Sequence, residues 1–391
     1  MRENQPTSEN RRFGSFLRGL REDRRLSLEA VEEMSLGLPE RVTKSHLSRI
    51  ENGRAIPTFP RMFTLSQIYG IPVAYLAERF EISLMREMFP SGATEQPVEE
   101  VVREARELER KGHFREALLM YEAVADRERS RNSEPVGLAE LELHCVHTLT
   151  KLGRWSTAKE DCERLLSSPV LTQRQKVIAL QSFAVCCYKL GKYTVALMAI
   201  ERADVELARL EDRQSLGALL IVLKGNVHFV MRRFDAAAAA FRDGVRQYET
   251  IGNVFESCRA RLNLAAALIE LGSRSRAREI LGQALRQAEG AGFDRQRAYA
   301  LSHLAALSFK ESDLDSAEAY GLRSNSIARP REYQSLLWRN CYYLWKIARS
   351  RNDDAAANSS ERTLRTYLNR AEGYMPEVED FKSHLLRGQE R

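Results

Sequence analysis

Apolar residues recur at helical spacing along most of the chain, which has no strand-rich region. Near the N-terminus this pattern predicts five short helices separated by turn residues and prolines. We expect them at residues 11–24, from Ser27 onward, at 43–52, at 60–69 and at 72–80. The sequence therefore predicts an all-α protein that begins with a compact five-helix domain.

The segment 42–53 combines a short helix with a polar outer face and a stop signal. Thr43 has the side-chain oxygen wanted at an N-cap, Leu47 and Ile50 lie three apart on one apolar face, and Gly53 can adopt the left-handed backbone that ends a helix. The opposite face carries hydrogen-bonding side chains long enough to reach base edges or phosphates in a major groove, namely Lys44, Ser45, His46 and Arg49. This face indicates a DNA-recognition helix.

The N-terminal domain resembles the Xre/Cro-type helix-turn-helix of phage repressors and bacterial regulators. The resemblance spans about residues 11–80 and rests on Leu26-Ser27-Leu28, Leu47-Ser48-Arg49-Ile50-Glu51-Asn52-Gly53, Pro57 and Tyr69-Gly70-Ile71-Pro72. It implies phosphate contacts by Thr43 and Asn52, base contacts by Lys44, Ser45, His46 and Arg49, a place in the DNA interface for Arg54, and an Arg21–Glu51 ion pair that locks the first helix onto the third.

Two features depart from that family. Leu28 stands where the family has a phosphate-contacting glutamine, so we expect that contact to be lost. Residues 34–41 form a turn longer than the family's by roughly five residues, which leaves the angle of the recognition helix open. Residues 11–54 hold ten Lys and Arg against seven Asp and Glu, a net charge of +3, within a chain of net charge +6. This mild excess favours DNA only weakly over the alternative, a five-helix domain that packs against protein.

From residue 98 to 331 a turn pattern recurs, in which a small or turn residue is followed two positions later by a large side chain and three further by alanine. Its six instances are Gly112-Phe114-Ala117, Gly153-Trp155-Ala158, Gly191-Tyr193-Ala196, Arg232-Phe234-Ala237, Gly272-Arg274-Ala277 and Ser312-Leu314-Ala317. The turn positions are 41, 38, 41, 40 and 40 residues apart. Spacing of this kind predicts stacked helical hairpins.

These hairpins resemble tetratricopeptide repeats, which implies a right-handed α-solenoid. We expect a linker at 81–97, about six repeats at 98–331, and a C-terminal hairpin and tail at 332–391. By the family's groove positions, the concave face that would take a peptide or partner carries Gln181, Tyr188, Lys189, Asn226, Phe229, Arg259, Tyr299, Ser302, Phe309 and Lys310. Asn226 lies in an apolar run, where it either clamps a ligand backbone or makes an internal hydrogen bond.

The combination of the two domains resembles the peptide-sensing PlcR/PrgX-like regulators of bacteria. It implies a homodimeric transcription regulator that binds a palindromic operator in double-stranded DNA and responds to a peptide or protein ligand. The alternative is an interaction scaffold, or a partner-controlled repressor without a peptide ligand.

Other chemistry is not indicated. We find no nucleotide-binding loop and no zinc-protease motif, so we expect no enzyme activity, no cofactor and no metal site. His144 and His147 lie three apart, but ordinary helix-surface histidines are the simpler interpretation. The six cysteines form no Cys-x-x-Cys pair and suit a reduced core. A polar N-terminus and the lack of a long apolar run predict a cytoplasmic protein without a membrane segment.

Overall fold

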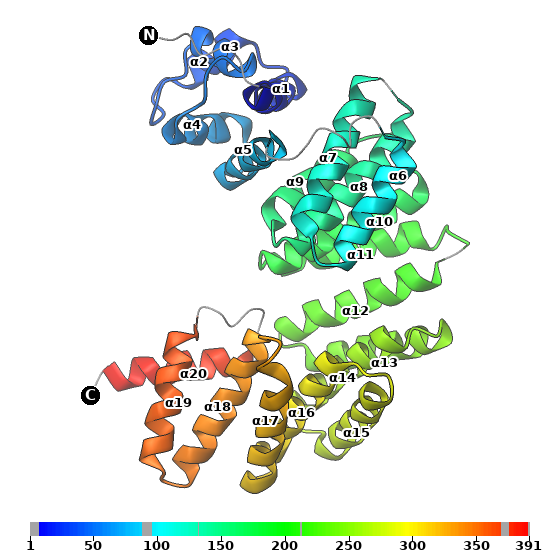
Figure 1. Ribbon diagram of the computed structural model, residues 1–391, viewed down its shortest axis with the longest axis vertical. Helices are drawn as coiled ribbons and strands as arrows, with labels where there is room; N and C mark the ends of the chain where they lie inside the picture. The colour runs from blue at the N-terminus through cyan, green and yellow to red at the C-terminus, as the bar shows by residue number, and fades with distance from the viewer. Residues whose placement is uncertain (1–7, 88–95, 132, 212, 369–374, 390–391) are drawn as a thin grey trace. The chain divides into compact units, whose positions relative to one another are not determined.

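The computed structural model describes residues 8–87, 96–131, 133–211, 213–368 and 375–389, and every regular element in these ranges is a helix (Figure 1). The chain divides into two compact units, Met1–Arg209 and Leu210–Arg391. The first unit holds the N-terminal domain and the first three hairpins, and the second holds the remaining hairpins. The protein is thus all-α, with a helix-turn-helix domain followed by a helical-hairpin array.

Five helices form the N-terminal domain. They are α1 (Ser8–Asp23), α2 (Leu28–Met34), α3 (Lys44–Glu51), α4 (Phe59–Tyr69) and α5 (Val73–Glu87). Helix α1 packs on both α3 and α5. The core between them is made of buried apolar side chains from all five helices and their connections, among them Phe13, Leu17, Val31, Leu47, Ile50, Leu65 and Leu76. These positions follow the helical periodicity of the sequence, so burial of one apolar face explains why such short helices are stable.

The repeats of the first unit are three antiparallel hairpins. Their helices are α6 (Val98–Arg110), α7 (Phe114–Ser130), α8 (Pro135–Lys151), α9 (Trp155–Leu166), α10 (Gln173–Lys189) and α11 (Tyr193–Leu207). The second helix of each hairpin begins at the aromatic residue of the turn pattern. The alanine three positions later is fully buried in each case, at Ala117, Ala158 and Ala196, which lets the paired helices approach closely.

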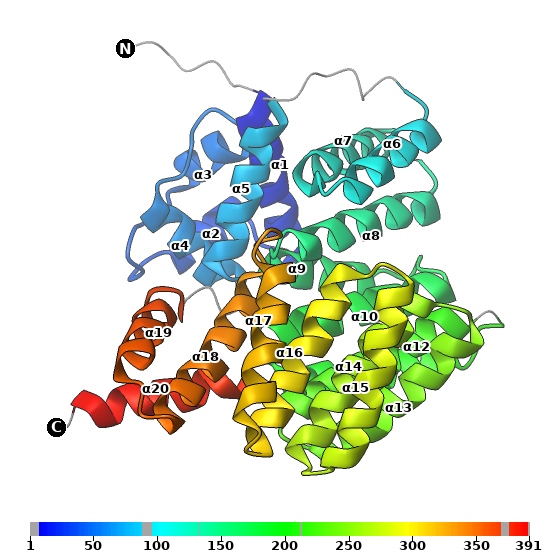
Figure 2. The same cartoon turned by 60° about the horizontal axis from the view of Figure 1, so that its bottom comes forward.

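The second unit continues the pattern with four hairpins and one last helix. The helices are α12 (Gln214–Val230), α13 (Phe234–Thr250), α14 (Val254–Glu270), α15 (Arg274–Gly290), α16 (Asp294–Lys310), α17 (Leu314–Ala328), α18 (Gln334–Ser350), α19 (Asp354–Thr366) and α20 (Pro376–Gln389). Consecutive helices from α12 to α19 lie side by side (Figures 1 and 2). At Gly225, on α12, an added Cβ would lie 2.6 Å from the Phe241 ring of α13, so only glycine allows this close approach of the paired helices.

The turns share one backbone conformation. The turn glycines Gly112, Gly153, Gly191 and Gly272 have φ between 72° and 85°. Arg232, Ser312 and Asn352 occupy the same position in their hairpins with φ of 59°, 65° and 56°. A left-handed residue after the first helix turns the chain and satisfies the last carbonyls, which is why glycine predominates there.

The structure differs from expectation near the predicted linker. Helix α5 does not end at Phe80 but continues to Glu87, because Ile82 and Met85 extend its apolar face into the repeats. The breaker-rich stretch 89–94 that suggests a hinge lies outside the described residues. The six cysteines are free, and all but Cys341 are buried. None of the described helices is long and apolar enough to cross a bilayer.

Candidate DNA interface and its junction with the repeats

Helix α3 is fixed at both ends by local interactions. Thr43 caps its start, since its Oγ1 accepts a hydrogen bond from the His46 N–H at 3.2 Å. Gly53 follows its end with φ of 70°, and an added Cβ there would lie 2.5 Å from the Arg11 backbone nitrogen. A Cβ on Gly14 would lie 2.4 Å from the Ile50 carbonyl oxygen. Two glycines therefore allow α1 and α3 to meet backbone to backbone.

A buried ion pair adds to this contact. Arg21 on α1 donates from Nε and Nη2 to the two carboxylate oxygens of Glu51, at 2.7 and 2.9 Å, and the Glu51 side chain is only 2% exposed. Arg21 also donates to the Leu26 carbonyl at 2.9 Å. The hydrogen bond with Glu51 raises the pKa of Arg21, so the guanidinium stays charged. A bidentate pair of this kind fixes both distance and orientation between the helices.

The outer face of α3 is open. Lys44, Ser45, Arg49 and the following Arg54 are exposed, and His46 is half-buried beside α4. Thr43 is exposed, although its hydroxyl already serves the cap. Asn52 donates to the Ser48 carbonyl at 2.7 Å and accepts from Arg18 Nη2 at 2.8 Å, so a phosphate would compete with these partners.

Two acids of α2 also belong to this surface, and the sequence did not single them out. Glu29 forms an ion pair with Lys44. Glu32 accepts hydrogen bonds from the Lys44 backbone N–H at 2.8 Å and from Arg41 at 2.6 Å. The hydrogen bond from the Lys44 side chain lowers the pKa of Glu29, and that from the Lys44 N–H lowers the pKa of Glu32. An anion thus already occupies the N-terminus of the recognition helix.

Helix α5 ties this domain to the first two hairpins. Its Tyr75 and Leu76 are part of the N-terminal core, whereas Ile82 belongs to the core of the repeats. On the same helix, Glu78 accepts a hydrogen bond from Thr157 of α9, and Glu81 pairs with Arg154 at 2.7 Å. One helix therefore contributes to two hydrophobic cores, a role that its local sequence does not reveal.

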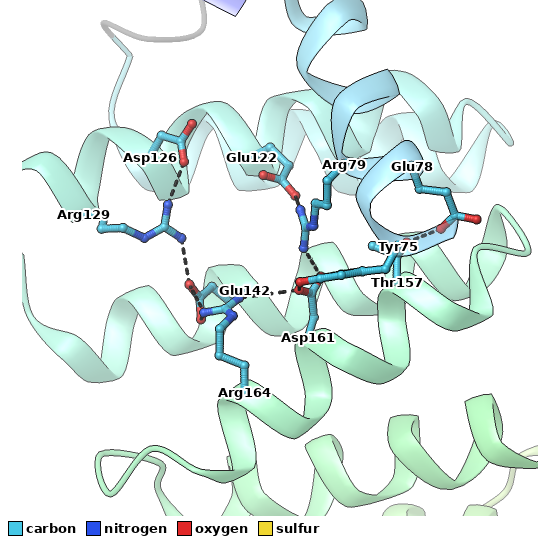
Figure 3. Close-up of polar contacts among 10 residues, drawn as sticks. All are labelled: Tyr75, Glu78, Arg79, Glu122, Asp126, Arg129, Glu142, Thr157, Asp161 and Arg164. Atoms are coloured by element: carbon cyan, nitrogen blue, oxygen red, sulfur yellow. Dashed lines mark hydrogen bonds and ion pairs between the residues drawn. The ribbon is translucent and has the colours of Figure 1, made fainter. Parts of the chain in front are cut away.

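At the centre of the junction lies a buried ionic cluster (Figure 3). The Arg79 side chain, 13% exposed, bridges Glu122 of α7 at 2.7 Å and Asp161 of α9. Tyr75 donates to Asp161 at 3.1 Å. Burial alone would lower the pKa of Arg79, but the carboxylates of Asp161 and Glu122 raise it, so the guanidinium stays charged.

A cavity of about 730 Å³ opens next to this cluster, between α1, α5, α7, α8 and α9. Its lining mixes arginines with carboxylates, including Arg11, Arg129 and Arg164 beside Glu122 and Glu142. Arg129 and Arg164 both pair with Glu142, at 2.8 and 3.1 Å. Because both signs of charge line the cavity, it does not offer a ligand a surface of one charge.

The predicted groove residues fall in both units. In the first, Lys189 lies over the Trp155 ring, Tyr188 packs near Tyr193, and Gln181 is half-buried. In the second, Asn226 accepts a hydrogen bond from Asn263 at 3.1 Å. Two of the others make ring contacts, Phe229 with Phe234 and Phe309 with Tyr343. Two form ion pairs, Arg259 with Glu256 and Lys310 with Glu270. The Arg295 guanidinium lies over the Tyr299 ring. Ser302 is fully buried and does not present its hydroxyl to a ligand.

Comparison with known proteins agrees with this arrangement. Residues 12–78 match the helix-turn-helix domain family. The N-terminal domain is a helix-turn-helix domain. No curated protein matches the chain by sequence.

Solved structures resemble the chain in fold. A Rap protein complexed with Competence and Sporulation Factor has a TM-score of 0.56 and 16% identity, over 73% of this chain and 78% of that one. NprR in complex with its cognate peptide NprX has a TM-score of 0.52 and 14% identity, over 74% and 84%. Aspartyl phosphate phosphatase F from Bacillus subtilis has a TM-score of 0.50 and 12% identity, over 96% and 86%. At these identities the likeness concerns the fold alone.

Proposed function

We propose that the protein is a sequence-specific transcription regulator whose helical repeats respond to a peptide or protein partner. The observation that carries the first half is the outer face of α3, where Lys44, Ser45 and Arg49 are exposed on a helix that glycine contacts and a buried ion pair hold in place. A rigid helix with polar, exposed side chains is what base recognition in a major groove requires.

A selection from duplexes with a randomised central segment tests DNA recognition directly. We expect the wild-type protein to enrich one motif, and Lys44→Ala with Arg49→Ala to bind it about 100-fold more weakly, since each base contact is worth about 1–3 kcal/mol. Arg103→Ala with Arg110→Ala on α6, whose side chains are 78% and 74% exposed, removes the same charge elsewhere and is the control. Selection of no motif, or equal binding by both double variants, would contradict the proposal.

We infer a homodimer, because one short recognition helix contacts few base pairs and two copies on a palindromic site add their affinities. Half-sites would then lie about 10 base pairs apart, or a multiple of that spacing. Light scattering of the complex with the enriched duplex measures this, with two chains per duplex expected. One chain on a non-palindromic motif would contradict it.

The repeats supply the second half of the proposal. In the second unit, the half-buried amides of Asn226 and Asn263 face each other across adjacent hairpins, and side-chain amides can pair with both sides of an extended backbone. Of the similar folds, NprR was solved with its cognate peptide and the Rap protein with Competence and Sporulation Factor. A non-enzymatic regulator in the bacterial cytoplasm fits these features better than a scaffold, for which an exposed recognition helix has no use.

Peptides that copurify with the protein, identified by mass spectrometry and resynthesised, test this half. We expect the active peptide to bind the wild type and to bind Asn226→Ala with Asn263→Ala about tenfold more weakly, in line with the loss of hydrogen bonds between neutral amide groups. A peptide that binds both forms equally would place the ligand elsewhere.

A further inference from the structure

The enlarged turn before α3 is fastened at both of its ends. Ser35 is fully buried, donates to the Glu32 carbonyl at 2.7 Å and accepts from the Val42 N–H at 3.0 Å. Near the far end, the Glu40 N–H donates to Thr64 Oγ1 of α4 at 3.2 Å. The insertion that distinguishes this chain from its family is therefore an ordered part of the domain that lies against α4.

The Glu40 carboxylate organises the start of α4. It accepts a hydrogen bond from Thr58 Oγ1 at 2.9 Å and forms an ion pair with Arg61 Nη2 at 2.7 Å. Thr58 is itself the N-cap of α4, with its Oγ1 accepting from the Arg61 N–H. Glu40 thereby fixes one end of the Arg61 guanidinium fork.

The second terminal nitrogen of the Arg61 guanidinium, Nη1, contacts the recognition helix. Arg61 Nη1 lies 3.1 Å from His46 Nε2. A guanidinium has only donors, so His46 Nε2 must be the acceptor of this hydrogen bond. The imidazole is then neutral and carries its proton on Nδ1.

We propose that Glu40 and Arg61 are positioning residues that hold His46 as a neutral Nδ1–H donor in the recognition surface, where it reads a base acceptor. The proposal rests on the proposed DNA-binding function and gives the enlarged turn a role in it. In the major groove the acceptors are N7 and O6 of guanine, N7 of adenine and O4 of thymine. A histidine that rotated freely or became charged would not present one fixed Nδ1–H donor to these acceptors.

The surroundings of His46 agree with a neutral ring. The charged groups that face it are Arg49 on its own helix, Arg61 on α4 and Glu40 in the turn. Burial and the two arginines lower the pKa of His46, while Glu40 opposes them. Because the pKa of His46 is lowered, its ring stays neutral at neutral pH and the hydrogen bond with Arg61 persists. This hydrogen bond is lost only as the pH falls below the ordinary pKa range of histidine.

Nitrogen NMR of the histidine rings in the free, full-length protein tests the tautomer without any DNA. We assign the His46 signals by their loss in His46→Gln. At pH 7.5 we expect the shifts of a neutral ring protonated at Nδ1, and in Arg61→Met a mixture dominated by the other tautomer. A charged ring, or an Nε2–H tautomer in the wild type, would overturn the proposal.

Selection from the randomised duplexes tests the consequence for recognition. Arg61→Met and Glu40→Gln should each enrich the wild-type motif with one position per half-site relaxed, by about tenfold in preference, and His46→Gln should relax the same position. Arg61→Lys, which keeps a donor, should show a base preference at this position between those of the wild type and Arg61→Met. An unchanged motif in Arg61→Met, with its fold intact by circular dichroism, would overturn the proposal. A wild type that selects no motif would refute DNA recognition and with it the assigned reading role, whereas the NMR result would still report the tautomer.

Discussion

At the scale of single residues, two acids of α2, Glu29 and Glu32, contact the start of the recognition helix. Lys44 faces bases in the family pattern, yet here it pairs with Glu29, and its backbone N–H is taken by Glu32. Glu29 competes with DNA for the Lys44 ammonium, whose side chain is 55% exposed. These acids weaken binding to DNA in general, because their negative charge repels phosphates at every site.

Glu29→Gln should therefore raise the affinity for unrelated duplex DNA by about twofold to fivefold at moderate salt, the range of one exposed ion pair. In this variant the Lys44 ammonium has no carboxylate partner at position 29 that competes with DNA. Glu104→Gln, an exposed acid on α6, makes the same change in net charge and is the control. Fluorescence anisotropy with a labelled random duplex measures both, and equal effects of the two variants would show that only the overall charge matters.

The sequence predicts some of these residues and misses others for a physical reason. Thr43, Leu47 and Gly53 are recognisable because capping, apolar spacing and helix termination depend on neighbours in the chain. Asp161 belongs to the junction with Tyr75, 86 residues away, and nothing in its local sequence separates it from an ordinary surface acid. In a chain with so many arginines, Arg79 was equally inconspicuous.

At the scale of helices and turns, the repeats depend on a left-handed residue in each hairpin. Arg232 holds φ of 59°, where a Cβ meets the backbone, whereas the equivalent glycines do so without strain. The helices on either side are nevertheless regular, so neighbouring packing compensates for the strained turn.

Replacing this arginine tests the requirement. Arg232→Gly should raise the free energy of unfolding by about 0.5–1 kcal/mol, because glycine relieves the backbone strain at more than its entropic cost. The neighbouring Arg233 is equally exposed but has φ of −89°, so Arg233→Gly should lower stability by a similar amount. Urea unfolding followed by circular dichroism compares the pair, and the same sign for both variants would contradict the interpretation.

At the scale of the molecule, the helix-turn-helix domain and the first hairpins belong to one compact unit. Helix α5 contributes to both cores, and its C-terminal extension, predicted to be linker, is what joins them. The apolar spacing of Ile82 and Met85 could have indicated the longer helix, but not which surface it would cover. A change of shape in these hairpins would thus act on α5, which packs on α1 of the helix-turn-helix domain.

Arg79→Met should break this connection. It leaves Asp161 and Glu122 buried without their shared cation, at a cost of about 3–5 kcal/mol to the contact. Hydrogen exchange by mass spectrometry should then show faster exchange in the second half of α5 and in α9, with the core of α1 to α4 still protected. Arg103→Met, on the exposed face of α6, should change neither.

Combining Arg79→Met with Asp161→Asn shows whether the cost of Arg79→Met comes from the lost ion pair or from lost packing. Asp161→Asn removes one of the two charges that Arg79→Met leaves uncompensated, so the two substitutions together should cost less than the sum of each alone. If the pair only fills space, the effects will add. If the junction carries signals from the repeats to DNA, Arg79→Met should also abolish the effect of the peptide on DNA affinity while the peptide still binds, because the hairpins would then change shape without moving α3.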